Sequence, residues 1–280
     1  CSIGQRTIGV FLSGGLDSSL IAHELNKLNG PARTFTNRMF PNVVTDEDFN
    51  SDADAAKNLA NEEKYNHTTV NITPENVMES WEDAIYYMEQ PMYNQSVAMY
   101  CYTNRILHEN GIVVTMAGDM GDELLGGYPK YWKMKSANYL QRQIGKDKIE
   151  SWDDVVALWM KRIKRPLAGI VMGGDLSREA VQEEIKKTYP DLFNPNDPIG
   201  SYMALDCVTQ VPEEFFNRND KYGMAYGMEG RFPLATKMFM KYCMSIHTDQ
   251  KIGKNKHQTK MLTKIAYDGH LPYWIIKKQK

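Results

Sequence analysis

Long apolar runs are absent from this sequence, and no stretch approaches the ~18 residues that a bilayer-spanning helix needs. No signal-peptide pattern stands at its start, so we expect neither secretion nor membrane association. An excess of one charge is also absent, because 33 Lys and Arg residues stand against 35 Asp and Glu residues. The resulting net charge of −2 provides no electrostatic reason to expect binding to nucleic acid or to an anionic membrane.

Cysteine is scarce, with four in 280 residues: Cys1, Cys101, Cys207 and Cys243. No two of them form a CxxC pair, and none lies at zinc-finger spacing from a histidine. The common zinc and dithiol motifs are therefore excluded. Buried free thiols in a reducing compartment are the expectation, and a cytoplasmic protein follows from it.

Two common phosphate-binding motifs are missing, the GxxxxGK[ST] loop with its lysine and the GxGxxG fingerprint. The sequence has instead Ser13-Gly14-Gly15-Leu16-Asp17-Ser18-Ser19, between an apolar run at 7–12 and helical spacing up to Gly30. We predict a strand, a glycine loop and a helix. Glycines permit a tight turn, and the helix N-terminus presents unpaired N–H groups to an anion. This corner is predicted to bind phosphate or pyrophosphate, with Asp17 holding the accompanying metal ion.

In the rest of the first half, apolar runs typical of strands alternate with apolar residues at helical spacing. We predict strands at 32–37, 68–72 and 112–117. We also predict three helices, one that begins after Ser51 as its N-cap, one at 73–89 and one at 97–110. Such alternation predicts an α/β fold with a parallel twisted sheet of about five strands and helices on both faces. Strand signals fade after about residue 131, and helical patterns follow at 151–165, from Ser177, at 238–246 and at 257–267. We therefore expect one domain over 1–280, with a nucleotide-binding part at 1–131 and a mainly helical part at 132–280.

A second polar cluster follows the predicted strand at 112–117. It contains Gly118-Asp119-Met120-Gly121-Asp122-Glu123 and then Gly126-Gly127-Tyr128. Ligands of parallel sheets bind beyond the carboxyl ends of the strands, so this segment and the loop at 13–19 should face the same crevice. Three carboxylates within five residues favour a metal–phosphate site in which Asp17 and Asp122 share Mg²⁺.

These motifs resemble the synthetase domain of asparagine synthetases. The segment at 13–19 is similar to the pyrophosphate loop of enzymes that cleave ATP between its α- and β-phosphates. The family's Ser-Gly-Glu-Gly-Ala-Asp-Glu before Gly-Gly-Tyr is matched by 117–123 and 126–128. Further matches occur in the family's order, at Glu89-Gln90-Pro91, at Asp220, Met224, Ala225, Glu229, Arg231 and Pro233, and at Gly253-Lys254, Lys260-Met261-Leu262, Leu271-Pro272 and Lys278-Gln279-Lys280. The resemblance covers almost the whole chain.

The resemblance implies an adenine nucleotide alpha hydrolase-like fold and an ATP-dependent ligase that makes asparagine. A carboxylate, aspartate in the family, would attack the α-phosphate to form an acyl-adenylate and pyrophosphate, and ammonia would then displace AMP. The residues implied to bind ATP are Leu12, Ser13, Gly14, Gly15, Asp17, Ser18, Ser19, Thr36, Asn37, Ala117 and Gly118. Those implied to act in catalysis are Asp119, Arg231 and Lys280, the last by neutralising phosphate charge.

Four departures from the family pattern bear on the function. Asp119 replaces a Glu, Met120 a Gly, Ala117 a Ser and Thr236 an Asp. Met120 strains or reshapes the loop if that position needs a positive φ. The departures leave two alternatives open, a β-lactam synthetase or peptide cyclase type of ligase with another acceptor, and a nucleotide-binding module without turnover.

The glutaminase domain that usually precedes this domain in the family is absent from the sequence. We therefore expect ammonia to come from solution, from a separate glutaminase partner, or from a domain outside this sequence. The small-molecule partners implied by the resemblance are ATP, aspartate and ammonia, and a homodimer is left open.

Overall fold

A computed structural model describes residues 6–40, 50–90, 94, 96–161 and 178–278. These residues form two compact units. The first comprises the described parts of Cys1–Met120, Gln210–Lys237 and Lys264–Lys278, and the second those of Gly121–Thr209 and Met238–Thr263. The chain thus leaves the first unit at Met120 and returns to it twice. The expected separation of a nucleotide-binding part at 1–131 from a helical part at 132–280 concerns function and stays a prediction.

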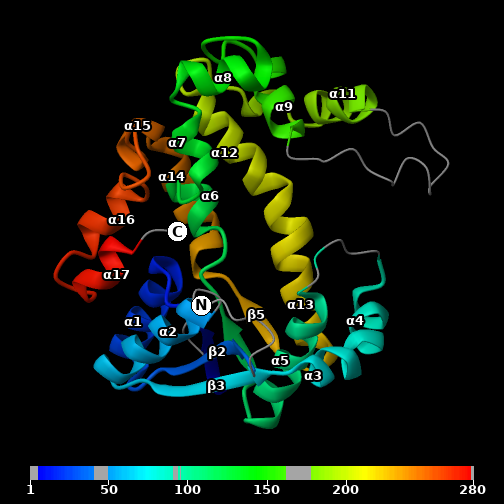
Figure 1. Cartoon of the computed structure of the whole chain (residues 1–280), viewed down its shortest axis with the longest axis vertical. Coiled ribbons are helices and arrows are strands. Elements are labelled where there is room, and N and C mark those ends of the chain that lie inside the picture. The colour runs from blue at the N-terminus through cyan, green and yellow to red at the C-terminus, as the bar shows by residue number, and fades with distance from the viewer. Residues whose placement is uncertain (1–5, 41–49, 91–93, 95, 162–177, 279–280) are drawn as a thin grey trace. The chain divides into compact units, whose positions relative to one another are not determined.

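The first unit contains the predicted parallel sheet (Figure 1). Its five strands lie in the order β3-β2-β1-β4-β5, and every neighbouring pair is parallel. The strands are β1 (Ile8–Phe11), β2 (Arg33–Met39), β3 (Asn66–Ile72), β4 (Val114–Met116) and β5 (Glu229–Arg231). The strand order reverses between β1 and β4, which is where parallel sheets open a crevice for ligands. The predicted fold class is confirmed.

Four strands occur where the sequence predicts them, and β5 does not. The interpretation that strands end near residue 131 is wrong for Glu229–Arg231, which pairs with β4 through Met116 and Arg231. Three residues with the sequence Glu-Gly-Arg contain no apolar run, so nothing local marks them as a strand. Pairing with β4 makes this edge segment extended.

Helices cover both faces of the sheet. Those of the first unit are α1 (Leu16–Asn29), α2 (Ser51–Glu62), α3 (Pro74–Glu79), α4 (Trp81–Met88), α5 (Val97–Glu109), η3 (Val211–Phe216), α13 (Asn217–Ala225), η4 (Pro233–Ala235) and α17 (Tyr273–Lys277). The connections from β1 to β2 to β3 step in one direction, and the connection to β4 steps back. Right-handed crossovers therefore place α1 and α2 on one face and α5 on the other. On the α5 side, Leu107 and Ile112 pack with Phe35, Val70 and Met228.

Two local predictions need correction. Asn50, rather than Ser51, is the N-cap residue of α2, and Ser51 is the first helical residue. The Asn50 side chain is engaged elsewhere, because it accepts from Met39 N (3.0 Å) and donates to Met39 O (3.1 Å).

The helix predicted at 73–89 is two helices, α3 and α4, separated at Ser80. Its predicted start is confirmed, since Thr73 Oγ1 accepts from Asn76 N (3.2 Å) in a capping box.

The second unit is helical, as predicted for much of the later chain. Its helices are α6 (Gly121–Leu125), α7 (Pro129–Lys133), α8 (Ala137–Ile144), α9 (Trp152–Met160), α11 (Arg178–Thr188), α12 (Pro198–Val208) and α15 (Thr248–Lys251), with most of α14 (Lys237–Ser245) and the first half of α16 (Met261–Ala266). Its core packs Tyr131, Leu158, Tyr202, Met203 and Ile252 together. The predicted helix end at 162–165 and the predicted start at Ser177 lie outside the described residues.

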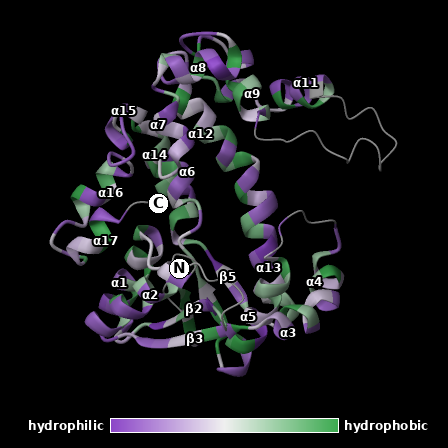
Figure 2. Ribbon diagram, viewed as in Figure 1, coloured by the Kyte–Doolittle hydropathy of each residue, from purple (hydrophilic) through white to green (hydrophobic). Residues whose placement is uncertain are grey.

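The apolar character of the described helices and the state of the cysteines are two further features of the fold. Among the described helices, none has the length and apolar character needed to cross a bilayer, and hydrophilic residues interrupt the hydrophobic ones along them (Figure 2). Cys101, Cys207 and Cys243 are buried free thiols, as predicted. Cys1 lies outside the described residues.

Candidate functional site

The glycine loop joins β1 to α1, and Gly14 gives it its shape. Gly14 has φ of +67°, a conformation that costs residues with a Cβ roughly 1–2 kcal/mol. A Cβ built on Gly14 would also lie 2.7 Å from both Ala55 Cβ and Ala56 N in α2. Both the backbone angle and the close approach of α2 therefore require glycine at this position.

The segment after β4 lies against this loop. A Cβ on Gly118 would lie 2.8 Å from the backbone carbon of Asp17 and from Ser18 N, so the two backbones are in direct contact. Ala117 N–H donates to Arg231 O (3.3 Å), which continues the pairing of β4 with β5. The predicted proximity of the residues after β1 and β4 is thus confirmed for Asp17 and Gly118.

Serine hydroxyls hold the loop from inside. Ser13 N–H donates to Ser18 Oγ (3.1 Å), and the hydroxyls of Ser18 and Ser19 donate to Gly15 O at 3.1 and 2.8 Å. Gly15 is the N-cap residue of α1 and makes no side-chain capping bond. The first turn of α1 therefore presents backbone N–H groups at the positive end of a 14-residue helix, an arrangement suited to an anion.

A lysine missed among the candidate residues reaches this loop. Lys278 Nζ donates to Gly14 O (3.3 Å) and to Asp52 Oδ1 (2.7 Å). The motif Lys278-Gln279-Lys280 pointed to this part of the chain, but Lys280 was the residue selected. Lys280 lies outside the described residues, so its role stays a prediction. Lys278 brings a cation to the backbone of the phosphate-type loop.

Three of the residues that the resemblance implies bind ATP, on its adenine side, lie directly after β1 and in β2. Leu12 is buried and donates its N–H to Phe35 O (2.8 Å). Thr36 is buried in β2, and the next residue, Asn37, accepts a hydrogen bond from Thr103 Oγ1 (2.9 Å). The Asn37 side-chain oxygen thus anchors α5 to the sheet, and adenine binding by these three residues stays a prediction.

Two predicted catalytic residues lie beyond β4 and in β5. Asp119 Oδ2 accepts from Asn219 Nδ2 (2.9 Å), which connects the acidic segment to α13. Arg231 Nε donates to Glu229 Oε1 (2.8 Å), and this bond raises the pKa of Arg231. Asn219 was missed, although it directly precedes the family-matched Asp220. Its amide orients Asp119, whereas the catalytic roles of Asp119 and Arg231 stay predictions.

Met120 confirms the expectation about the altered loop position. Its φ is +74°, in the left-handed region that favours glycine, and its side chain is only 2% exposed. A bulky residue in this conformation costs about 1–3 kcal/mol unless its surroundings compensate, and buried apolar contact provides that compensation. A methionine therefore occupies a left-handed backbone position in this chain.

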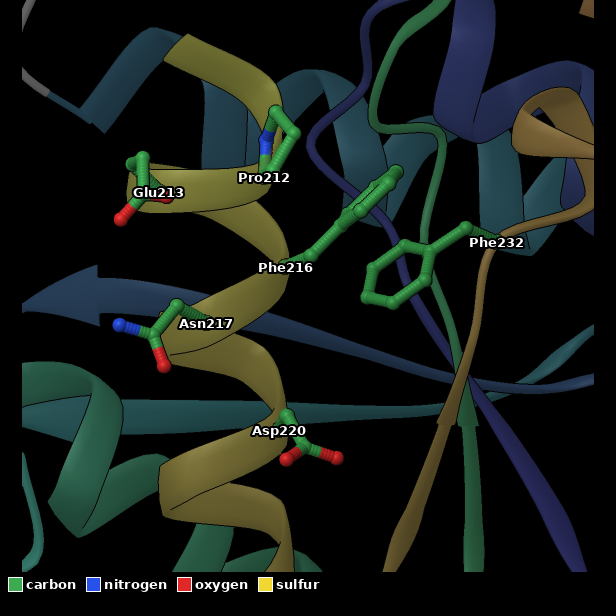
Figure 3. A pocket seen from close by; sticks show the side chains of 6 residues that line it. All are labelled: Pro212, Glu213, Phe216, Asn217, Asp220 and Phe232. Carbon is green, nitrogen blue, oxygen red and sulfur yellow. The ribbon is translucent and has the colours of Figure 1, made fainter. Parts of the chain in front are cut away.

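An open pocket of about 490 Å³ lies in the first unit beside η3, α13 and the end of β5 (Figure 3). Phe216 and Phe232 point toward each other across it, with ring centroids 4.3 Å apart and planes tilted by 30°. Glu213, Asn217 and Asp220 also line it, and none of the described Lys or Arg residues does. Aromatic walls suit a flat group, and the two carboxylates disfavour an anion.

The remaining acidic residues belong to the second unit. Asp122 forms an ion pair with Lys260, with 2.6 Å between Asp122 Oδ1 and Lys260 Nζ, and both side chains are about nine-tenths buried. A Cβ on Gly127 would collide with this carboxylate, so glycine makes room for it. Glu123 accepts from the Tyr128 hydroxyl (2.9 Å). Burial, with the neighbouring Asp122 carboxylate, nevertheless raises the pKa of Glu123 to about 7.

The donor set is compatible with Mg²⁺ bound together with phosphates. The described residues contain no cluster of three His, Cys, Asp or Glu side chains arranged for a metal ion. Magnesium at phosphate sites needs only one or two carboxylates, since phosphate oxygens and water complete its coordination. Asp17, in the first turn of α1, provides one such hard oxygen donor, while Asp122 shares its charge with Lys260. The metal site stays a prediction.

The requirement for glycine at position 14 can be tested with a matched pair. Gly14→Ala is expected to lower the free energy of unfolding by about 2–4 kcal/mol, because strain and collision with α2 add. Gly145 has a similar φ of +71° in the left-handed region, but a Cβ at this position would meet no atom within 4 Å. Gly145→Ala should therefore cost only the strain, about 1–2 kcal/mol. Urea denaturation measures both, and equal losses would contradict the role of the α2 contact.

The fold and the loop together define a class of protein. The strand order, the glycine loop after β1 and the contact of Gly118 with it define an α/β protein with a parallel sheet and a phosphate-type loop at the carboxyl end of its first strand. The family model for asparagine synthase matches residues 1–280. The chain belongs to the asparagine synthase family.

Individual relatives are distant. Over 98% of its length the chain is 22% identical to asparagine synthetase [glutamine-hydrolyzing] 1 of Bacillus subtilis, and over 95% it is 25% identical to the asparagine synthetase [glutamine-hydrolyzing] of Mus musculus. It covers 45% and 37% of those proteins, so it spans less than half the length of these relatives. A solved U34-tRNA thiolase structure from Methanococcus maripaludis has 16% identity, 76% coverage of both chains and a TM-score of 0.33, too low to support an argument.

Proposed function

We propose that this chain is an ATP-dependent amide-forming ligase that activates a carboxylate as its acyl-adenylate. The observation that carries the proposal is the glycine loop, where Gly14, the uncapped start of α1 and Lys278 converge at the carboxyl end of β1. Such a corner suits pyrophosphate. Membership of the asparagine synthase family supports the choice of reaction.

The proposed reaction follows from where the phosphates would lie. The loop holds the β- and γ-phosphates as the leaving pyrophosphate, with adenine toward Leu12, Thr36 and Asn37. An aspartate carboxylate oxygen attacks the α-phosphorus, the bond to the β-phosphate oxygen breaks, and pyrophosphate leaves. Ammonia then attacks the acyl carbon, loses a proton and displaces AMP to give asparagine. The reaction needs positioning and charge neutralisation more than covalent participation by the protein.

Several side chains have proposed roles in this scheme. Asp17 and Asp122 would hold Mg²⁺, which neutralises phosphate charge when bound. Lys280 would neutralise phosphate charge, and Arg231 would act in catalysis. Asp119, oriented by Asn219, would lie near the reacting acyl group. The nitrogen would come from a glutaminase domain or partner, as the glutamine-hydrolyzing relatives suggest, or from free ammonia, and the reaction would occur in the cytoplasm.

Isotopic exchange of pyrophosphate into ATP tests the adenylation step. Exchange is expected when ATP, Mg²⁺ and aspartate are all present, and not when the carboxylate is omitted. Exchange with another carboxylate but not with aspartate would correct the substrate and retain the reaction. ATP binding without exchange for any carboxylate would contradict the ligase and leave a nucleotide-binding module.

A further inference from the structure

A second cavity lies within the second unit. It has a volume of about 190 Å³ and is bordered by α6, α12, α15 and η2 (Pro190–Leu192). All of its lining residues belong to the second unit. The polar ones central to its chemistry are Glu123, Asp191, Asp197, Cys207 and Lys251. This volume suits a small metabolite better than a nucleotide.

Lys251, the last residue of α15, is the unusual member of this wall. It is only 4% exposed. Within the described part of the chain, no hydrogen bond or ion pair joins its ammonium group to another residue. Burial lowers the pKa of Lys251, although Cys243, Asp197 and Cys207 act in the opposite direction. A buried, unpaired cation is costly, so its place on a cavity wall points to a ligand that completes its interactions.

Asp197, the carboxylate that acts electrostatically on Lys251, already has other hydrogen-bond partners. Its Oδ1 accepts from Gly200 N (3.0 Å), and its Oδ2 accepts from the N–H and the hydroxyl of Thr248, each at 2.8 Å. Asp197 therefore caps α12 and joins it to α15, and it does not bind Lys251 directly. The lysine ammonium is left for another acceptor.

The charges of the whole wall restrict what that acceptor is. Asp191 and Glu123 present carboxyl groups to the same cavity. A simple anion would pair with Lys251 but meet these acids, and a simple cation would meet Lys251. A small molecule that carries both a carboxylate and an ammonium group satisfies both signs. Leu124, Met203 and Met244 provide apolar surface for the rest of the molecule.

We propose that this cavity binds a free α-amino acid whose carboxylate pairs with Lys251. The proposal does not depend on the ligase reaction, because binding is measured without ATP or Mg²⁺. Failure of pyrophosphate exchange would leave it standing, and failure of amino-acid binding here would leave adenylation standing.

The first experiment uses the full chain and isothermal titration calorimetry. The twenty common L-amino acids are screened by thermal shift, and those that bind are titrated. For the binding amino acid, the analogue without the amino group and the amine without the carboxyl group should each bind about tenfold or more weakly. Equal binding of either analogue, or no binding by any amino acid, would overturn the proposal.

Two variants then locate the site. Lys251→Met is expected to weaken binding about ten- to hundredfold and to raise the thermal midpoint, because it removes an uncompensated buried charge. Lys135→Met is the control, since Lys135 is paired with Asp249 and Ile252 O, at 2.5 and 2.7 Å. It should leave binding unchanged. Wild-type affinity in Lys251→Met, or a lowered midpoint that marks Lys251 as structural, would overturn the proposal.

A cavity-filling variant covers the case in which Lys251→Met does not fold. Ala204 lines the same cavity from α12. Ala204→Leu reduces its volume while the lysine and the acids remain. Loss of amino-acid binding in a folded Ala204→Leu protein is the expected result, and unchanged affinity would overturn the proposal.

Discussion

Asp17→Asn should reduce ATP–pyrophosphate exchange about 10²–10³-fold and change the free energy of unfolding by less than about 1 kcal/mol. Asp17 lies in the first turn of α1, and its backbone carbon and Cβ contact the position of Gly118. Asn has nearly the same shape, so the backbone contact survives. What it lacks is the negative charge that the proposed magnesium ion needs.

The measurement is exchange rate against Mg²⁺ concentration, with denaturation as a check on folding. Asp54→Asn is the matched control, because Asp54 is a half-exposed acid on α2 that pairs with Arg38. Exposed pairs contribute roughly 0–1 kcal/mol, so this variant should exchange within about fivefold of the wild type. An Asp17→Asn protein with wild-type exchange and an unchanged Mg²⁺ requirement would remove Asp17 from the proposed metal site.

Asp206→Ala is expected to lower the free energy of unfolding by about 3–5 kcal/mol. Asp206 is fully buried in α12. Its Oδ2 accepts from Lys130 Nζ (2.5 Å) and from the Tyr131 hydroxyl (2.7 Å), and its Oδ1 accepts from Trp159 Nε1 (3.0 Å). Alanine would remove this shared acceptor from three donors at once, and the fully buried Tyr131 hydroxyl could not recover it from water.

The aromatic surroundings increase the expected loss. Lys130 Nζ lies 5.0, 5.1 and 5.4 Å from the ring centroids of Tyr128, Tyr131 and Tyr202. In the wild type, these three rings and the Asp206 carboxylate together stabilise the ammonium group. In Asp206→Ala, only the rings would remain to balance its charge. The Asp206 network is therefore a central stabilising feature of the second unit.

Asp249→Ala provides the comparison for Asp206. Its ion pair with Lys135 has the same 2.5 Å separation, but Asp249 is 71% exposed. Solvent screening reduces the value of such a pair to roughly 0–1 kcal/mol. Urea denaturation of both variants measures the difference. Similar shifts of the two midpoints would show that burial does not amplify the Asp206 interactions.

Local patterns predicted the parts of the fold whose causes are local. The apolar run before Ser13, the glycines and the helical spacing after Asp17 are neighbours in the chain, and they predicted the strand, loop and helix that the structure contains. The motif at 117–123 likewise predicted a segment beside the loop. Met120 shows where local patterns stop being sufficient. From the sequence, strain at Met120 followed only if its φ was positive, and the structure gives that φ as +74°.

Tertiary structure decided the features that depend on distant partners. Glu229–Arg231 is a strand only because β4 offers it hydrogen-bonding groups, and Lys278 reaches Gly14 across 264 positions of sequence. The burial of Lys251 depends in the same way on how α15 packs in the second unit. Periodicity and turn residues report the conformation of neighbouring residues. The surroundings of a side chain arise from long-range packing, so a lysine at position 251 and a lysine on the surface have the same appearance in the sequence.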